Sequence, residues 1–136
     1  MKKLLLLILL TLSSSANHIS WLGDYKTALS QAKKEKKNIM VLLVKKECQP
    51  CNQSIIKNFM NRDYIDELNQ KYISVIVTYE GRISYPIELF YSTVFPTLFF
   101  VKSEDESFLR KPMYGEEIDE FFDKRDNAVG SLRQKN

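Results

Sequence analysis

The stretch that most constrains the fold is a run of six apolar residues, 39–44 (IMVLLV), in a chain of 136 residues. A strand with one solvated face alternates apolar and polar residues, so an unbroken apolar run indicates a strand buried on both faces. Cys48 stands four residues after this run, and Cys51 follows three residues later. The pattern predicts a central strand that leads directly into a helix beginning near the two cysteines.

The first sixteen residues have a separate character. A positive start (1–3) precedes an apolar stretch (4–12) and a group of small residues (13–16), which is the three-part pattern of a secretory signal peptide. The apolar stretch is far shorter than the ~20 residues that a membrane-spanning helix needs. We therefore expect cleavage after Ala16 and one mature domain, residues 17–136. The alternative is an N-terminal membrane anchor that stays uncleaved.

Charge excludes some classes of partner. Removal of Lys2 and Lys3 lowers the number of basic residues from 20 to 18, against 17 acidic residues. A nearly neutral domain carries no argument for binding nucleic acid or anionic lipid. The mature protein is expected to be a soluble monomer in the periplasm or otherwise exported, without stable membrane insertion.

The two cysteines enclose only two residues. A disulfide that stabilises a fold normally closes a long loop, because the entropy removed from the unfolded chain grows with loop length. A bridge between Cys48 and Cys51 would close almost none. An exported protein also meets an oxidising compartment. The spacing therefore indicates a chemical role for the cysteines rather than a structural one. They could form a redox pair or half of a metal site, and the third alternative is that the spacing is a coincidence of composition.

Apolar periodicity predicts an α/β fold. The expected sheet is mixed and four-stranded, with helices on both faces. The first two strands are joined by a helical crossover and should be parallel, whereas the last two are joined by a short turn and should be antiparallel. Pro112 should place the last strand at an edge. The expected elements are a helix over 21–35, a strand over 39–44, two helical segments ending near 60 and 70, a strand over 72–80, a short helix opening at Pro86, strands over 97–102 and 107–114, and a final helix after Gly115.

The predicted order places Cys48 at the beginning of a helix. Free backbone N–H groups and the helix dipole favour an anion there. We expect the pKa of the Cys48 thiol to fall below the free value of ~8.5, into the range of roughly 3.5 to 7.5 found at such sites. Cys51 lies one helical turn further on. Cys48 is thus predicted to be the exposed, attacking sulfur and Cys51 the sheltered, resolving one.

At this point the chain resembles the thioredoxin superfamily, and in particular its exported thioredoxin-like members. A lone CxxC motif is a weak signal, but here it follows a buried strand, and an X-Pro-Thr motif opens another strand about 45 residues later. The resemblance covers about residues 20–125. The residues that carry it are Cys48-Gln49-Pro50-Cys51, Phe95-Pro96-Thr97, Gly115, and a front segment with Trp21, Asp24-Tyr25, Ala28-Leu29, Ala32-Lys33 and Lys37.

The resemblance implies a thioredoxin-like fold and a thiol–disulfide oxidoreductase without a cofactor. It implies that Pro96 is a cis proline beside a redox-active Cys48–Cys51 disulfide, and that Phe95, Pro96 and Thr97 form the substrate-binding segment. The implied partners are exported proteins that contain cysteine and an upstream protein that exchanges disulfides with this one.

Three positions depart from the pattern of thioredoxins proper. Glu47 stands where they have tryptophan, and Gln49-Pro50 stands where they have Gly-Pro. Leu42 takes the place of a buried acid that helps move the proton of the resolving cysteine. Lys46 and Glu47 are expected to modulate the pKa of the Cys48 thiol in opposite directions, the lysine lowering it and the glutamate raising it.

Two other functions stay open at this stage. Two soft thiolates could hold Cu(I) or zinc, although His18 is expected in a flexible segment and no complete metal site is predicted. The fold could also serve as a partner-binding domain without redox turnover. The direction of electron flow and the identity of the clients do not follow from the residues.

Export gives the first testable prediction. Mass spectrometry of the protein isolated from its native host should show a chain that begins near Asn17, because the small residues before it suit signal peptidase. An intact Met1 on cytoplasmic protein would contradict both export and the inference of an oxidising compartment.

Overall fold

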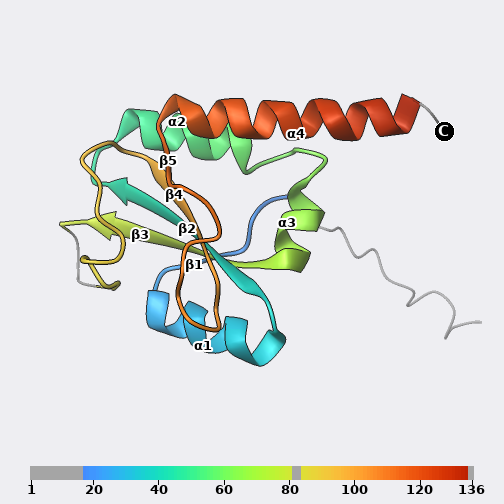
Figure 1. Ribbon diagram of the computed structural model, residues 1–136. Coiled ribbons are helices and arrows are strands. Elements are labelled where there is room, and N and C mark those ends of the chain that lie inside the picture. Colours follow the sequence, from blue (N-terminus) through green and yellow to red (C-terminus); the bar gives the residue numbers. More distant parts are fainter. Residues whose placement is uncertain (1–16, 81–83, 135–136) are drawn as a thin grey trace, which may run out of the picture.

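The computed structural model describes residues 17–80 and 84–134, with side chains described as far as residue 127 (Figure 1). The predicted signal peptide, residues 1–16, lies outside the described residues. The elements in chain order are β1 (Trp21–Leu22), α1 (Tyr25–Glu35), β2 (Asn38–Lys45), α2 (Gln49–Asn58), α3 (Ile65–Lys71), β3 (Tyr72–Tyr79), β4 (Thr97–Val101), β5 (Met113–Tyr114) and α4 (Glu116–Gln134).

The strands form one mixed sheet in the order β1-β3-β2-β4-β5. β3 runs parallel to both β1 and β2. β4 runs antiparallel to β2 and to β5. The predicted α/β class, the parallel first pair, the antiparallel last pair and the edge position of the last strand are all confirmed.

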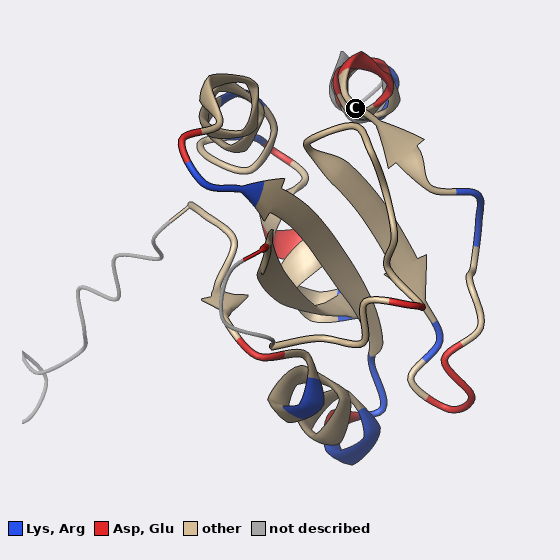
Figure 2. Ribbon diagram, turned by 90° about the vertical axis from the view of Figure 1, so that its left-hand side faces the viewer, with Lys and Arg blue, Asp and Glu red and all other residues tan. Residues whose placement is uncertain are grey.

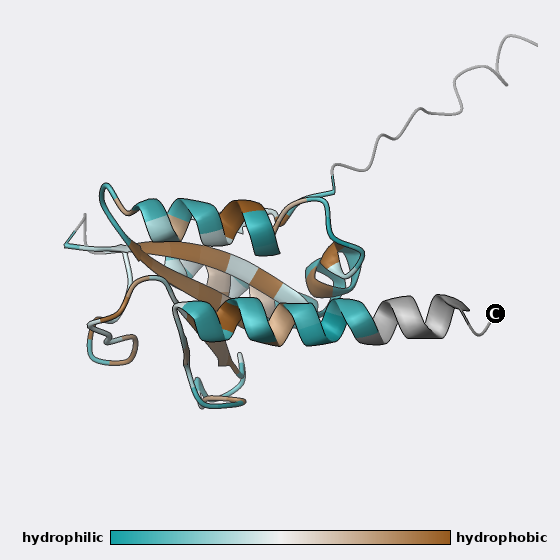
Figure 3. Ribbon diagram, turned by 90° about the horizontal axis from the view of Figure 1, so that it is seen from above, coloured by the Kyte–Doolittle hydropathy of each residue, from teal (hydrophilic) through white to brown (hydrophobic). Residues whose placement is uncertain are grey.

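Helices cover both faces of the sheet, with α2 and α4 on one face and α1 on the other (Figure 1). Successive residues in the apolar run of β2 belong alternately to the cores on the two faces of the sheet. Met40, Leu42 and Val44 belong to the core on the α2 and α4 side. Ile39, Val41 and Leu43 belong to the core on the α1 side. The strands of the sheet are largely hydrophobic, whereas α2 and α4 are mostly hydrophilic with a few hydrophobic bands (Figure 3). β2 is the central strand that the sequence predicted.

The sheet has five strands rather than the predicted four, because Trp21 begins a strand and not a helix. The Asp24 side chain accepts a hydrogen bond from the Thr27 N–H at 2.9 Å and so caps α1, which starts at Tyr25. The preceding residues are then free to pair, and Trp21 lies in register with Ser74. The Trp21 ring packs edge-on against Phe59, with centroids 5.2 Å apart.

Two further predicted elements are shorter than expected. The segment after Pro86 forms a turn, in which the Pro86 carbonyl accepts from the N–H groups of Leu89 and Phe90. The strand predicted over 107–114 is reduced to β5 and an isolated bridge between Phe108 and Val101. Pro112 has no N–H to donate to a ladder, and regular pairing resumes only after it.

The buried face of α2 also differs from the sequence pattern, in which Ile55, Ile56, Phe59 and Met60 recur at helical spacing and predict an apolar stripe. Phe59, which caps the helix, is fully buried, but Ile56 is 66% exposed and Met60 is 41% exposed. Ser54 and Asn58 are buried instead. The Asn58 amide donates to Ser54 Oγ at 3.2 Å and to Asp119 of α4 at 2.6 Å. These polar side chains can face inward because they bond to each other and to α4.

The packing of α4 gives a stability prediction. Phe122 is fully buried and contacts Phe59 and Tyr64, with ring centroids 5.2 and 5.0 Å away. Phe122→Ala should lower the free energy of unfolding by about 3–5 kcal/mol, since it removes apolar contacts and leaves a cavity. Urea denaturation measures this change.

Ile56→Ala is the matched control, because it also shortens an apolar side chain on a helix. Ile56 is 66% exposed, so its truncation should change the unfolding free energy by no more than about 0.5 kcal/mol. Equal losses in the two variants would contradict the described packing of α4.

Candidate active site

The candidate site begins where β2 ends. Lys46 and Glu47 connect β2 to α2, and Glu47 has a left-handed backbone with φ of 54°. This connection carries positive and then negative charge at the tip of the strand (Figure 2). Both side chains are exposed, and their effect on the cysteines stays a prediction.

Cys48 is the N-cap residue of α2. Its sulfur accepts a hydrogen bond from the Cys51 N–H at 3.1 Å. The two cysteines form a disulfide with an S–S distance of 2.04 Å. Pro50 lies in the first helical turn, where the absence of an N–H leaves no intrahelical bond unmade. A sulfur at this position meets the N–H groups and dipole of the helix start, as the sequence predicted.

The burial of the two cysteines differs from the prediction. Cys48 was expected to be exposed, yet it is 4% exposed in the disulfide form, against 2% for Cys51. Both belong to the core cluster on the α2 and α4 side. A difference in their reactivity must therefore come from the start of the helix and from the opening of the disulfide, and not from unequal exposure in the oxidised form.

The interior beneath the disulfide is apolar. Leu42 is fully buried in the same cluster as both cysteines. No aspartate or glutamate is among the buried residues that the structure describes. The described core thus offers no buried carboxylate to take the proton of the Cys51 thiol.

The second motif opens β4 beside the end of β2. Thr97 pairs with Leu43, so Pro96 lies one residue further toward the end of β2 from which the cysteines extend. The Phe95–Pro96 peptide bond is cis, as the resemblance implies. The Thr97 side chain is fully buried and donates to the Val94 carbonyl at 2.6 Å. Its hydroxyl holds the loop, and the substrate-binding role of the motif stays a prediction.

Phe95 connects the two motifs through side chains that the sequence did not single out for this role. The ammonium group of Lys45, three residues before Cys48, lies 5.5 Å from the Phe95 ring centroid. The ring of Tyr79, the last residue of β3, also lies near Phe95, with ring centroids 5.2 Å apart. Sequence order could not reveal these contacts, because they depend on the ends of β2 and β3 lying beside the start of β4.

Exposed apolar side chains lie along the second motif. Tyr91 is 63% exposed and Val94 is 45% exposed, both just before Phe95. Tyr114, which is 39% exposed, lies opposite Thr97. Val94 is also close to Gly115, since a Cβ atom on this glycine would lie 3.8 Å from a Val94 methyl group. The segment around the cis proline therefore presents apolar surface to solvent.

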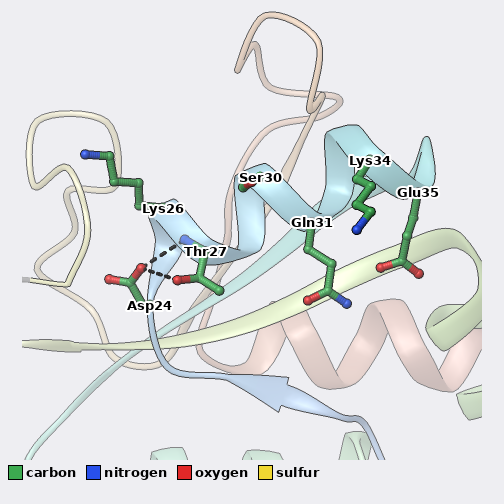
Figure 4. Close-up of a pocket in the computed structure, with 7 residues that line it drawn as sticks. All are labelled: Asp24, Lys26, Thr27, Ser30, Gln31, Lys34 and Glu35. Atoms are coloured by element: carbon green, nitrogen blue, oxygen red, sulfur yellow. Dashed lines mark hydrogen bonds between the residues drawn. The ribbon is translucent and has the colours of Figure 1, made fainter.

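Away from the cysteines, a hollow lies along the outer side of α1 (Figure 4). Its residues include Asp24, Thr27 and Lys34. The N–H and hydroxyl groups of Thr27 donate to the Asp24 carboxylate and hold its pKa below the usual range. This carboxylate is the cap of α1, and the hollow is the ordinary surface of a capped helix.

Among the residues that the structure describes, no group of three or more His, Cys, Asp or Glu side chains could hold a metal ion. His18, which was expected in a flexible segment, forms an isolated antiparallel β-bridge with Met60 through its backbone. None of the helices in the described part of the chain is both long and apolar enough to cross a bilayer.

Known proteins share this architecture. A family model described as thioredoxin-like matches residues 20–103. A solved structure named DsbH Oxidoreductase superposes with a TM-score of 0.60 at 20% identity, covering 78% of this chain and 79% of that one. A chain from the crystal structure of a ferredoxin:thioredoxin reductase and thioredoxin f2 complex gives a TM-score of 0.51 at 18% identity, covering 88% and 98%. At these identities the likeness shows the fold. No curated protein matches the chain by sequence.

The helix start predicts unequal thiols in the reduced protein. At pH 7, iodoacetamide should alkylate Cys48 at least about ten times faster than Cys51, because the thiolate is stabilised at the helix N-terminus. Rates of alkylation measured by mass spectrometry against pH, with the single variants Cys48→Ser and Cys51→Ser, give the two apparent pKa values. Equal rates would contradict the assignment of Cys48 as the nucleophile.

Proposed function

The chain belongs to the thioredoxin-like family, and on this premise we propose that it is an exported thiol–disulfide oxidoreductase acting on proteins that contain cysteine. The observation that carries the proposal is the Cys48–Cys51 disulfide at the first turn of α2. A bond that closes a loop of two residues adds little stability, so its use is exchange. The apolar surface of Tyr91, Val94 and Tyr114 supports a polypeptide as the substrate.

The reaction needs only the two sulfurs and the client. In the reducing direction, the Cys48 thiolate attacks one sulfur of a client disulfide, and the other client sulfur leaves as a thiolate. The Cys51 thiolate then attacks Cys48 Sγ and releases the second client thiolate. Two electrons pass to the client, and the Cys48–Cys51 disulfide is restored. The oxidising direction is the same sequence reversed.

The surroundings of the disulfide assign further roles. The start of α2 stabilises the Cys48 thiolate both as nucleophile and as leaving group. With Leu42 beneath the cysteines, Cys51 has to lose its proton to solvent or to the departing client thiolate. An upstream protein that exchanges disulfides would return the pair to its starting state, and the relative reduction potentials set the direction of flow.

Serine variants of each cysteine test this mechanism. Cys51→Ser should accumulate stable mixed disulfides through Cys48, because no second sulfur remains to release the client. Cys48→Ser should trap few clients and catalyse insulin reduction no faster than the uncatalysed reaction. Non-reducing gels and mass spectrometry of protein expressed in the periplasm identify the trapped clients and the sulfur that holds them.

The two variants are matched controls for each other, since each removes one sulfur from the same bond. Mixed disulfides that form mainly through Cys51 would reverse the two roles. If neither cysteine exchanges and the reduced protein instead holds Cu(I) tightly, the oxidoreductase proposal fails and metal binding replaces it.

A further inference from the structure

A second cleft, of about 370 Å³, lies at the end of the sheet opposite the disulfide. Its residues include Asn38, the first residue of β2, and Tyr72, the first residue of β3. Cys48 follows the other end of β2, and eight residues of strand span roughly 23 Å. The cleft is therefore separate from the site of exchange.

Aromatic rings form one wall of this cleft. The rings of Tyr72 and Phe100 lie 5.0 Å apart, and those of Phe100 and Phe121 lie 6.0 Å apart. Leu68 and Leu109 complete the apolar lining. These side chains come from β3, β4, α3, α4 and the segment before β5. The wall therefore forms only in the tertiary fold. It suits a flat apolar group, since aromatic surfaces stack on one another.

Two arginines stand beside the aromatic wall. The Arg110 guanidinium lies over the Phe121 ring, 4.5 Å from its centroid. Within the described residues Arg110 forms no ion pair, so its charge is uncompensated by a carboxylate. Arg125 bonds to Glu67 at 2.6 Å, but its Nε is buried without a hydrogen-bond partner.

The Asn38 amide and the Tyr72 hydroxyl are further polar groups of the lining. The Asn38 amide oxygen accepts from the Ser103 N–H at 3.3 Å. No residue that lines the cleft is acidic. The charged side chains of the lining are thus both positive, which is the complement of an anion.

From these features we propose that the cleft binds a small aromatic carboxylate, with the ring beside Tyr72 and Phe121, which are partly exposed, and the carboxylate on Arg110. The planar guanidinium matches a carboxylate through two parallel hydrogen bonds. The volume of about 370 Å³ lies within the ~300–1,000 Å³ of small-molecule sites. One uncompensated arginine beside aromatic side chains favours a singly charged aromatic acid over a compact, strongly hydrated anion such as phosphate.

Ligand titrations of the purified protein test the proposal. Phenylacetate is the probe, phenylacetamide is its neutral isostere, and inorganic phosphate represents charge without a ring. Phenylacetate should bind, and the amide and phosphate should each bind at least about tenfold more weakly, because each lacks one of the two recognised features. Chemical shift changes in ¹H–¹⁵N spectra should centre on the backbone around Tyr72, Phe100 and Phe121.

A neighbouring pair of variants isolates the role of Arg110. Arg110→Gln should weaken phenylacetate binding about tenfold, as expected for loss of a charge-assisted pair. Lys111→Gln removes the same charge from the next residue, which does not line the cleft, and should leave the affinity unchanged. Both variants should retain insulin reduction at the wild-type rate, which shows that they are folded and that exchange is independent of the cleft.

Several results would overturn the proposal. These are no shift up to about 10 mM phenylacetate, equal binding of the amide or of phosphate, equal weakening by the two variants, or shifts centred away from the three aromatic residues. The spectra locate the ligand in the wild-type protein, so the conclusion does not depend on the stability of a variant.

Discussion

The burial of β2 on both faces is the constraint on which the rest of the structure depends. Alternate residues of this strand enter two different cores, so helices must cover both sides of the sheet. β2 pairs with β3 over its whole length and with β4 over most of it. The ends of these strands come together as a consequence, and both motifs of the candidate site lie where β2 ends and β4 begins.

The disulfide takes its chemistry from this placement. The central strand β2 ends at Lys45, and a short connection leads from it into α2. Cys48 therefore lies at the cap position, where the backbone N–H groups of a helix start have no intrahelical partner. Its partner Cys51 is buried slightly more deeply, in an apolar core that also contains Leu42. In the proposed mechanism an attacking sulfur at the helix start is therefore combined with a resolving sulfur that has no buried carboxylate in the described core to assist it. This combination separates the chain from thioredoxins proper although the fold is shared.

The second cleft depends on the opposite ends of the same strands. Arg110 and Phe121 are eleven positions apart in the chain and face each other only because the segment before β5 crosses to the start of α4. Neither residue belongs to a recognisable motif. The aromatic pairs that form its wall also stabilise the packing of α4 on the sheet, so the same side chains serve the core and line a potential binding surface.

Local patterns in the sequence determined the central strand, the parallel and antiparallel pairings, the cap position of Cys48 and the two motifs of the candidate site, because each depends on residues close together in the chain. They also led to errors where a local preference was outweighed. Ile56 and Met60 matched an apolar stripe, yet α2 turns Ser54 and Asn58 inward because Asp119 of α4 offers Asn58 a hydrogen bond. Trp21 fits a helix by spacing but pairs with β3. Only the tertiary structure could decide these positions, the contact of Lys45 with Phe95 and the cleft beside Arg110, because the partner in each case lies on an element distant in sequence.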